Sequence, residues 1–375
     1  MERCSVNGIP EEALTAIEER FGSRFEWEAF GEESLGSVFP ESAEEVEFLT
    51  KLAARHSIPL VARGAGTALY PGKPPRSLAV RFDAMRGIRL PEPREDWVEV
   101  EPGVTWWALE ERLREGGMGP RVYPTSAPRS TVGGWLAENG VGVGSYEYGW
   151  LLQNVLRVEV VLAGGKRDLI EGEPLRHLVG SRGSMGFFVR ARLATRRAVG
   201  DVHVGAIFRE VNDLAGAVLD LYRGGAPLWH LGFLNAAMAR ARSLHRGHVL
   251  FGAYPEERSS RVEPALRRAY DSYRGRTLPR EEAHRVWEQR YFAARSSGPI
   301  PGRAFVQGAR LAPTLVELER KLAGVAIQGT VVRWGEVSLL AFDPAKGDAG
   351  LVDLSAATDI ELVRLAGRSW MPERR

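Results

Sequence analysis

Glycine is concentrated in three loops of the N-terminal half of this 375-residue chain. The loops are residues 63–72 (RGAGTALYPG), 124–149 (PTSAPRSTVGGWLAENGVGVGSYEYG) and 180–189 (GSRGSMGFFV). Because glycine has no Cβ, it lets main-chain N–H groups come close to a bound anion or a flat ring. Three such loops predict a binding site for a large ligand that carries phosphate.

Two common nucleotide motifs fit the first loop poorly. The G-x-G that starts at Gly64 could open a Rossmann dinucleotide fingerprint, but Leu69 stands where the third glycine belongs. The run of residues 66–73 is one residue too long for a P-loop, and Pro74 replaces the Ser or Thr that binds magnesium. A Rossmann site and an ATPase are therefore the weaker alternatives.

The order of short motifs along the chain is more informative than any one of them. The motifs are Arg63-Gly64-Ala65-Gly66-Thr67, Pro124-Thr125-Ser126, Thr131-Val132-Gly133-Gly134, Asn139-Gly140, Tyr148-Gly149 and the run from Gly180 to Gly186. Over residues 36–200 this order resembles the PCMH-type FAD-binding domain of the vanillyl-alcohol oxidase superfamily. Within that superfamily it is most similar to the FAD-linked D-lactate and glycolate dehydrogenase branch. The resemblance implies that the protein binds FAD.

On the pattern of that family, the first loop cradles the FAD pyrophosphate with main-chain N–H groups, and Ser126 and Thr131 add hydroxyl donors. The later loops pass the ribityl chain and the adenine. The residues expected to bind FAD are Arg63, Gly64, Ala65, Gly66, Thr67, Gly72, Pro124, Thr125, Ser126, Thr131, Gly133, Gly134, Asn139, Gly142, Tyr148, Gly149, Gly186 and Val189. Some relatives tether FAD through histidine or cysteine, but neither occurs between His56 and His177, so we expect non-covalent FAD.

The resemblance also implies a small anionic 2-hydroxy acid as the substrate. Trp287-x-x-Arg290 matches a segment whose arginine holds the substrate carboxylate in related dehydrogenases. A guanidinium suits this task because it presents two parallel donors and stays charged. The alternative for Arg290 is a salt bridge on a helix surface. Arg303 and Arg310 flank a strand similar to one in the family, and either is a candidate second carboxylate clamp.

Oxidation of a 2-hydroxy acid requires a group that takes up the hydroxyl proton. His230 is the leading candidate, because its apolar strand-like segment would keep the imidazole neutral. A structural core histidine is the alternative, and Tyr291 and His203 are the reserves. Many relatives carry a metal-binding run of the His-x-Gly-Asp-Gly-Asn-x-His type, but residues 328–337 at that place contain no histidine. We therefore expect no metal.

Charge and hydropathy limit the partners. The chain has 50 Lys and Arg against 48 Asp and Glu, a formal net charge of +2, which argues against nucleic-acid binding. No apolar run reaches the roughly 18 residues of a membrane span, and the N-terminus is too polar for a signal peptide. We expect a cytoplasmic protein that reaches a membrane only through a partner, with a homo-oligomer left open.

Periodicity predicts an α+β fold in two parts. Residues 1–200 would form the FAD-binding domain, 201–342 an α+β cap domain with an antiparallel sheet and helices on one face, and 343–375 a C-terminal tail. The expected helices are 42–57, which starts with a capping box, 105–115, 213–222, 236–244, 264–273 and 313–323. The expected strands include 58–62, 77–82, 97–101, 155–162, 187–195, 202–208, 227–233, 249–254, 303–311 and a hairpin over 325–342.

Two functions of different classes remain. The leading hypothesis is oxidation of a D-2-hydroxy acid, D-lactate before glycolate, by hydride transfer to FAD, with electrons passed to a dye-like, quinone or protein acceptor. The alternative is an FAD-binding subunit of a glycolate oxidase-type complex that docks an iron–sulfur protein and lacks a complete active site. A sugar or alcohol oxidase of the same superfamily fits less well, because arginines in the expected pocket favour an anionic substrate.

Overall fold

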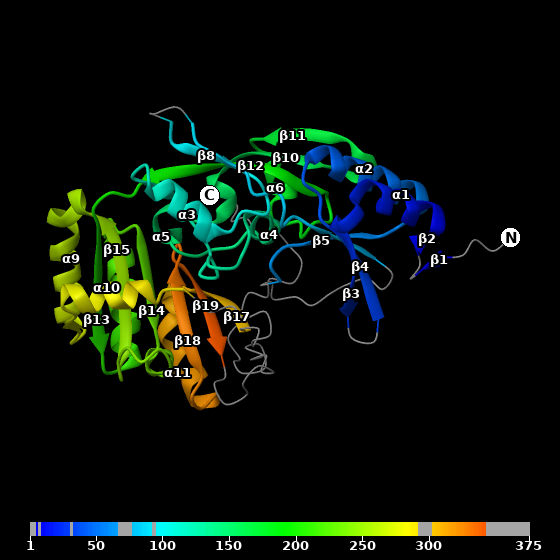
Figure 1. Ribbon diagram of the computed structural model, residues 1–375. Coiled ribbons are helices and arrows are strands. Elements are labelled where there is room, and N and C mark those ends of the chain that lie inside the picture. The colour runs from blue at the N-terminus through cyan, green and yellow to red at the C-terminus, as the bar shows by residue number, and fades with distance from the viewer. Residues whose placement is uncertain are drawn as a thin grey trace. The chain divides into compact units, whose positions relative to one another are not determined.

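The computed structural model describes residues 5–6, 9–30, 33–66, 77–91, 95–291 and 302–342 (Figure 1). Its contacts divide the chain into two compact units. The first unit comprises Met1–Leu113, Ala127–Gly140 and Asn154–Thr195, and the second comprises Arg114–Ser126, Val141–Gln153 and Arg196–Arg375. The domain boundary at residue 200 stays a prediction, and two short segments of the glycine-rich half group with the second unit. The expected tail, 343–375, lies outside the described residues.

The first unit contains a four-stranded sheet with the order β3-β4-β6-β5. Its strands are β3 (Phe25–Phe30), β4 (Glu33–Val38), β5 (Leu60–Arg63) and β6 (Leu78–Arg81). β5 and β6 are parallel, with Arg63 opposite Arg81. Their carboxyl ends therefore lie at one edge of the sheet, where the first glycine loop begins. Helices α1 (Glu11–Phe21) and α2 (Ala43–His56) share an apolar core with this sheet.

A second sheet of this unit contains the order β11-β10-β12-β8-β7. Its strands are β7 (Ile88–Arg89), β8 (Trp97–Val100), β10 (Val155–Val161), β11 (Arg167–Glu171) and β12 (Phe187–Arg197). The helices beside it in the sequence are α3 (Trp106–Arg114), α4 (Val132–Glu138) and α6 (Leu175–Leu178). A short pair, β1 (Ser5–Val6) and β2 (Ile9–Pro10), precedes the first sheet.

The second unit is built on one seven-stranded sheet with the order β16-β13-β15-β14-β18-β19-β17, and all its strand pairs are antiparallel. The strands are β13 (Asp201–Phe208), β14 (His230–Leu234), β15 (His248–Pro255), β16 (Arg276–Thr277), β17 (Gly302–Gln307), β18 (Ala326–Val331) and β19 (Glu336–Phe342). The helices are α5 (Ser145–Tyr148), α7 (Val211–Arg223), α8 (Ala236–Ala241), α9 (Ser259–Ser272), α10 (Arg280–Glu288) and α11 (Leu311–Lys321), and β9 is Met118–Pro120.

The two faces of this sheet differ in chemistry. One face packs against α7, α9 and α11 and carries apolar side chains such as Leu231, Leu250 and Ile327. Since side chains alternate along a strand, their neighbours point to the opposite face, and these include His230 and Gln328. We call this second surface the polar face of the sheet.

The expected helices and strands all have counterparts, but three details were wrong. The expected strand 303–311 ends at Gln307, because residues 308–310 form a short 3₁₀ turn and α11 begins at Leu311. The expectation that the helices of the second unit lie on one sheet face fails for α10, whose side chains contact His203 on the polar face. No helix was expected at α10, although its buried residues Ala283, Val286 and Trp287 follow helical spacing. In addition, α9 begins at Ser259, before the expected start, and contains Pro264.

Candidate functional site

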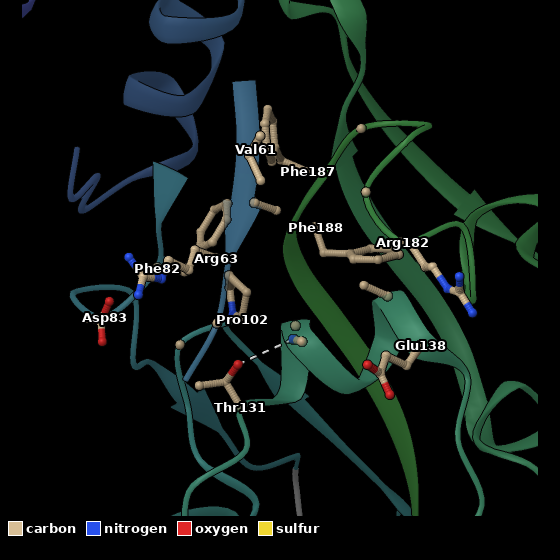
Figure 2. A pocket seen from close by; sticks show the side chains of 18 residues that line it. Val61, Arg63, Phe82, Asp83, Pro102, Thr131, Glu138, Arg182, Phe187 and Phe188 are labelled. Atoms are coloured by element: carbon tan, nitrogen blue, oxygen red, sulfur yellow. Dashed lines mark hydrogen bonds between the residues drawn. The ribbon is translucent and has the colours of Figure 1, made fainter. Parts of the chain in front are cut away.

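A cavity of about 300 Å³ lies within the first unit, where β5 and β6 end (Figure 2). Predicted FAD-binding residues from all three glycine loops meet there: Arg63, Gly64, Thr131, Gly133, Gly134 and Gly186. The rings of Phe82, Phe187 and Phe188 also line the cavity and give it apolar surface. The remaining lining residues are Val61, Ala62, Asp83, Pro102, Gly103, Ala137, Glu138, Arg182 and Gly183.

Close approach of the main chain explains the glycine at position 133. The Gly133 N–H donates to the Pro102 carbonyl at 2.9 Å. A Cβ added at Gly133 would lie 2.6 Å from Pro102 Cβ and 3.1 Å from its Cα. A side chain at this position would therefore push apart two segments of the cavity wall.

The Thr131 hydroxyl is placed to act as a donor toward a ligand. Thr131 caps α4, and its Oγ1 accepts from the Gly134 N–H at 3.3 Å, the dashed line of Figure 2. A threonine hydroxyl that accepts one hydrogen bond keeps its own O–H to donate. The role of this hydroxyl in FAD binding stays a prediction.

Arg63 is already neutralised by a carboxylate. Arg63 Nη1 lies 2.5 Å from Glu28 Oε2, and Arg81 Nη1 lies 2.6 Å from the other oxygen of Glu28. Burial alone would raise the pKa of Glu28, but the Arg81 hydrogen bond and the Arg63 charge together lower it. Glu28 therefore stays ionised, and its ion pair with Arg63 holds the residue at which the first glycine loop begins. The compensated charge makes Arg63 a weak partner for a phosphate.

The other predicted FAD-binding residues lie outside the lining of this cavity. Ala65, Gly66, Asn139 and Val189 belong to the first unit, where Asn139 ends α4 in a left-handed conformation and Val189 is buried in β12. Pro124, Thr125, Ser126, Gly142, Tyr148 and Gly149 belong to the second unit. Thr67 and Gly72 lie outside the described residues. The role of each of these residues in FAD binding stays a prediction.

The sequence reasoning missed one group of cavity residues, whose place depends on which strands are neighbours. Phe82 and Asp83 directly follow β6, as Gly64 directly follows β5. Since parallel strands end at the same edge of a sheet, pairing β5 with β6 would have brought these positions together. Pro102 and Gly103 come after β8, with Glu101 between them and the strand.

In the second unit, a glycine loop holds His230. The Gly144 N–H donates to His230 Nδ1 at 3.3 Å. Gly144 has a φ of +86°, and a Cβ there would lie 2.0 Å from the Arg121 carbonyl oxygen. Only glycine lets the loop take this course.

The environment of His230 makes it a neutral hydrogen-bond donor. His230 is 1% exposed, and burial together with the Arg290 charge lowers its pKa to about 3. A neutral imidazole whose Nδ1 accepts a hydrogen bond carries its proton on Nε2. This tautomer is inferred from the hydrogen bond with Gly144. Two features thus count against the base role predicted for His230: it is a weak base, and its lone pair is occupied.

Strand register places a second histidine beside it. His203 and His230 both lie opposite Ala253, from the two sides of β15. Because Ala253 has only a methyl group, the indole of Trp287 fits between the two imidazoles. It stacks on His203 at 4.9 Å between ring centroids and meets His230 edge-on at 5.6 Å. Burial, with His284 and Arg290 nearby, lowers the pKa of His203 to about 4.

Arg290 is buried just beyond the end of α10 and is 5% exposed, which excludes the alternative of a helix-surface salt bridge. Its Nε donates to the Tyr123 hydroxyl at 3.0 Å, its Nη1 to the Trp287 carbonyl at 3.0 Å, and its Nη2 to the Tyr291 hydroxyl. The guanidinium also lies over the rings of Trp287, at 4.5 Å, and Tyr291, at 4.1 Å. The structure thus gathers Arg290, Tyr291 and Trp287, with His230 against Trp287.

Among the described residues, Arg303 makes no hydrogen bond, ion pair or ring contact with this cluster. It is half-buried on β17, and its buried Nε has no hydrogen-bond partner in that part of the chain. Arg310, the other candidate second clamp, is exposed in a short turn before α11. Its exposure makes Arg310 the weaker of the two candidates.

The described residues show neither a cluster of metal ligands nor a membrane-spanning helix. Over the described ranges, no three His, Cys, Asp or Glu side chains gather as a metal site would require. None of the helices described there combines the length and hydropathy of a membrane-crossing segment.

The sequence comparisons agree with the cavity. Residues 35–167 match the family described as FAD binding domain. The probable mitochondrial D-lactate dehydrogenase of Danio rerio is 31% identical over 220 residues, 54% of this chain and 44% of that protein. The D-lactate dehydrogenase of Archaeoglobus fulgidus is 29% identical over 202 residues, 51% of this chain and 45% of its own length. Glycolate oxidase subunit GlcD of Bacillus subtilis is 30% identical over 165 residues, 41% and 35% of the two chains. The matched regions span less than half of each relative.

Solved structures extend the likeness to most of the chain. An alkyldihydroxyacetonephosphate synthase superposes with a TM-score of 0.72 at 16% identity, over 91% of this chain and 78% of that one. The 4-ethylphenol oxidase of Gulosibacter chungangensis, in complex with isoeugenol, gives 0.70 at 18% identity, over 89% and 83%. At these identities the likeness is one of fold, and it confirms the predicted α+β class.

Proposed function

Since this chain carries an FAD-binding domain at residues 35–167, similar to that of FAD-linked hydroxy-acid dehydrogenases, we propose that it oxidises a small D-2-hydroxy acid. D-lactate is the first substrate to test and glycolate the second. The electrons would pass to a quinone, a dye-like acceptor or an iron–sulfur protein. The observation that carries the proposal is the buried guanidinium of Arg290 between two phenol hydroxyls.

The cavity of the first unit has the chemistry to hold part of FAD. Main-chain segments that approach closely at Gly64 and Gly133, with the Thr131 hydroxyl, suit the pyrophosphate. The faces of Phe187 and Phe188 suit a flat ring such as adenine. At about 300 Å³ the cavity is at the low end of ligand pockets, so the rest of the cofactor would extend beyond it. We propose non-covalent binding, because no His or Cys lies between residues 57 and 176.

Arg290 would bind the substrate carboxylate. A buried guanidinium attracts an anion more strongly than an exposed one, because water screens it less. The Tyr123 and Tyr291 hydroxyls, which accept from Arg290, orient the guanidinium plane. The stack on Trp287 restrains the plane further. Such a fixed fork favours a planar carboxylate over a neutral sugar or alcohol.

FAD, when bound, accepts a hydride from the carbon that carries the hydroxyl group. In our proposal His230 donates its Nε2–H to the substrate oxygen and stabilises negative charge that develops there. In place of His230, Tyr291 would take up the hydroxyl proton as its phenolate, which the Arg290 guanidinium stabilises, and would become a neutral phenol.

Two substitutions of His230 separate the donor role from the base role. Glutamine keeps an N–H donor but cannot serve as a base, whereas alanine removes both functions. If His230 is a donor, His230→Gln should keep kcat within about tenfold of the unsubstituted protein and His230→Ala should lose more. A base role would make the two variants equally slow, by about 10²–10⁴-fold.

The activity itself is tested by anaerobic bleaching of the bound flavin. A panel of D- and L-2-hydroxy acids is mixed with the holoprotein, and the flavin absorbance is followed. We expect D-lactate or glycolate to bleach it and the L-isomers to react far more slowly. A flavin that no member of the panel reduces would overturn the proposal for the isolated chain.

A second candidate is supported by the likeness to GlcD, which is named as a subunit of glycolate oxidase. The chain would then be an FAD-binding subunit that works only in a complex with an iron–sulfur protein. The same bleaching assay separates the two functions. Reduction by the purified chain alone favours the dehydrogenase, and reduction only after the partner proteins are added favours the subunit.

A further inference from the structure

The backbone of Arg290 is held by a glutamine from a distant strand. Gln328, on the polar face of β18, is 2% exposed. Its Nε2 donates to the Arg290 carbonyl oxygen at 3.0 Å, and its Oε1 accepts from Arg242 Nη2 at 2.7 Å. The orientation of the amide follows from this second contact, because arginine can only donate. The NH₂ group of Gln328 is therefore the group that faces Arg290.

Arg242, which directly follows α8, orients this glutamine and also binds the end of α10. Its Nη1 donates to the Gln289 carbonyl oxygen, one residue before Arg290. Burial lowers the pKa of Arg242 to about 10, so the guanidinium stays charged at neutral pH. A cation is favourable at this place because the last carbonyl groups of a helix carry partial negative charge.

Arg290 is thus fixed at both ends. Arg242 binds the carbonyl group of Gln289, and Gln328 binds the next carbonyl group, that of Arg290 itself. The Tyr123 hydroxyl and the Trp287 ring hold the guanidinium. Since misplacement of a binding group by about 1 Å can cost 10²-fold in rate, the backbone contacts matter for binding as well as for folding.

We propose that Gln328 and Arg242 are positioning residues that set the affinity of the Arg290 guanidinium for its carboxylate ligand. This inference rests on the proposed role of Arg290 as the carboxylate clamp. Neither residue touches the substrate in this scheme. They act through the carbonyl groups that lead into Arg290.

Gln328→Glu is the sharpest variant. A glutamate keeps an oxygen for Arg242 and pairs with it as an ion, but it presents a second oxygen, not an N–H, to the Arg290 carbonyl. Repulsion between the two oxygens should move Arg290 while the contact with Arg242 survives. Gln289→Glu is the matched control, because it adds the same charge next to Arg290 from a side chain that makes no hydrogen bond to the other described residues.

The readout is the affinity of the FAD-loaded protein for oxalate, an unreactive carboxylate, by titration calorimetry. We expect Gln328→Glu to raise the oxalate Kd about tenfold, which corresponds to about 1.4 kcal/mol, and Gln289→Glu to change it less than about threefold. In an Arg290→Ala background, Gln328→Glu should add no further loss, because both act through one group. An additive loss would mean that Gln328 acts by some other route and would overturn the proposal.

The single variant Arg290→Ala distinguishes a failure of this inference from a failure of the proposed function. If it weakens oxalate binding but Gln328→Glu behaves like Gln289→Glu, the positioning role is wrong and the clamp stands. If Arg290→Ala binds oxalate normally, the clamp is wrong and the positioning role falls with it. Should circular dichroism show that Gln328→Glu does not fold, Arg242→Lys replaces it. A lysine cannot bind Gln328 and the Gln289 carbonyl as one planar fork, so it should also raise the oxalate Kd, and an unchanged Kd would overturn the proposal.

Discussion

The two candidate binding regions use different parts of the polypeptide. The cavity of the first unit is made of main chain brought close at Gly64 and Gly133, and the charge of Arg63 at its edge is compensated by Glu28. The polar face of the second unit uses buried side chains, Arg290 and His230 above all. A site built from backbone should be sensitive to added volume, and a site built from buried side chains should be sensitive to altered charge. The following experiments test that difference.

Acid should have the largest effect, and it should act through the histidines of the polar face. The pKa values of His230 and His203 are lowered in the fold to about 3 and about 4, against an ordinary value of 6.5. The unfolded chain therefore binds more protons between pH 6.5 and pH 4, and stability is lost as the pH falls through this window. Each histidine contributes at most about 1.4 kcal/mol per pH unit to the free energy of unfolding. Denaturant titrations at pH 7.5 and 4.5 measure this loss, and His230→Gln should reduce it. Equal stability at both pH values would contradict the buried neutral histidines.

Removing the charge of Arg290 comes next. Arg290→Ala deletes charge-assisted hydrogen bonds worth about 1.5–3 kcal/mol, or about ten- to a hundred-fold in kcat/KM for the best 2-hydroxy acid. Arg290→Lys should restore only part of this, since an ammonium lacks the planar fork. Arg285→Ala, which removes an exposed arginine from α10, is the matched control and should leave kcat/KM nearly unchanged. FAD content should be normal in all three variants. A normal kcat/KM in Arg290→Ala would contradict the carboxylate-binding role of Arg290 and make Arg303 the next candidate for it.

Adding a single methyl group should damage the first region. Gly133→Ala places a Cβ 2.6 Å from Pro102, and such overpacking costs about 1–3 kcal/mol. We expect the FAD Kd to rise about tenfold, measured by fluorescence titration of the apoprotein. Gly87→Ala is the control, because its Cβ would meet only the Glu101 side chain, which can move. Equal FAD affinity in the two variants would show that close approach at Gly133 is not needed.

Removing a charge from the same region should do little. Arg63→Met breaks a partly exposed ion pair with Glu28, and Arg81 remains to bind that carboxylate. Such pairs contribute about 0–1 kcal/mol, so the FAD Kd should change by less than about fivefold. If Arg63→Met raised the FAD Kd more than Gly133→Ala does, the first region would be more sensitive to charge than to added volume.

Chelation should have the smallest effect of all. The described residues contain no group of three metal-ligating side chains, so turnover is expected to survive exhaustive treatment with EDTA. Activity that disappears and returns with zinc or manganese would reveal a metal site elsewhere in the chain.

The backbone-built region was the easier one to predict from sequence. Glycine is itself the signal of close approach, and Gly64, Gly133 and Gly186 from three separate loops do line one cavity. Phe82 and Pro102 were missed because a phenylalanine or a proline after a strand carries no such signal. Their place in the cavity depends on which strands are neighbours, and only the fold supplies that.

The side-chain region was predictable in part. His230 and Arg290 were candidates from sequence, but their surroundings depend on strand register. The fit of Trp287 between His203 and His230 requires both strands to pair with Ala253. The role of His230 also changed, because a backbone N–H from a distant loop occupies its Nδ1. No local pattern in the sequence encodes that contact.

The division of the chain into two units has a consequence for how the protein can be built and cut. The chain passes between the units at residues 113, 126, 140, 153 and 195, so neither unit is one continuous segment. Tyr123 and Gly144 are synthesised well before their partners Arg290 and His230. Their hydrogen bonds can therefore form only after those later residues have been made. A gene fragment that stops at residue 200 would contain both segments but lack the sheet on which they fold. Exchange of the C-terminal half with that of a relative would therefore divide the core of the second unit between two parents.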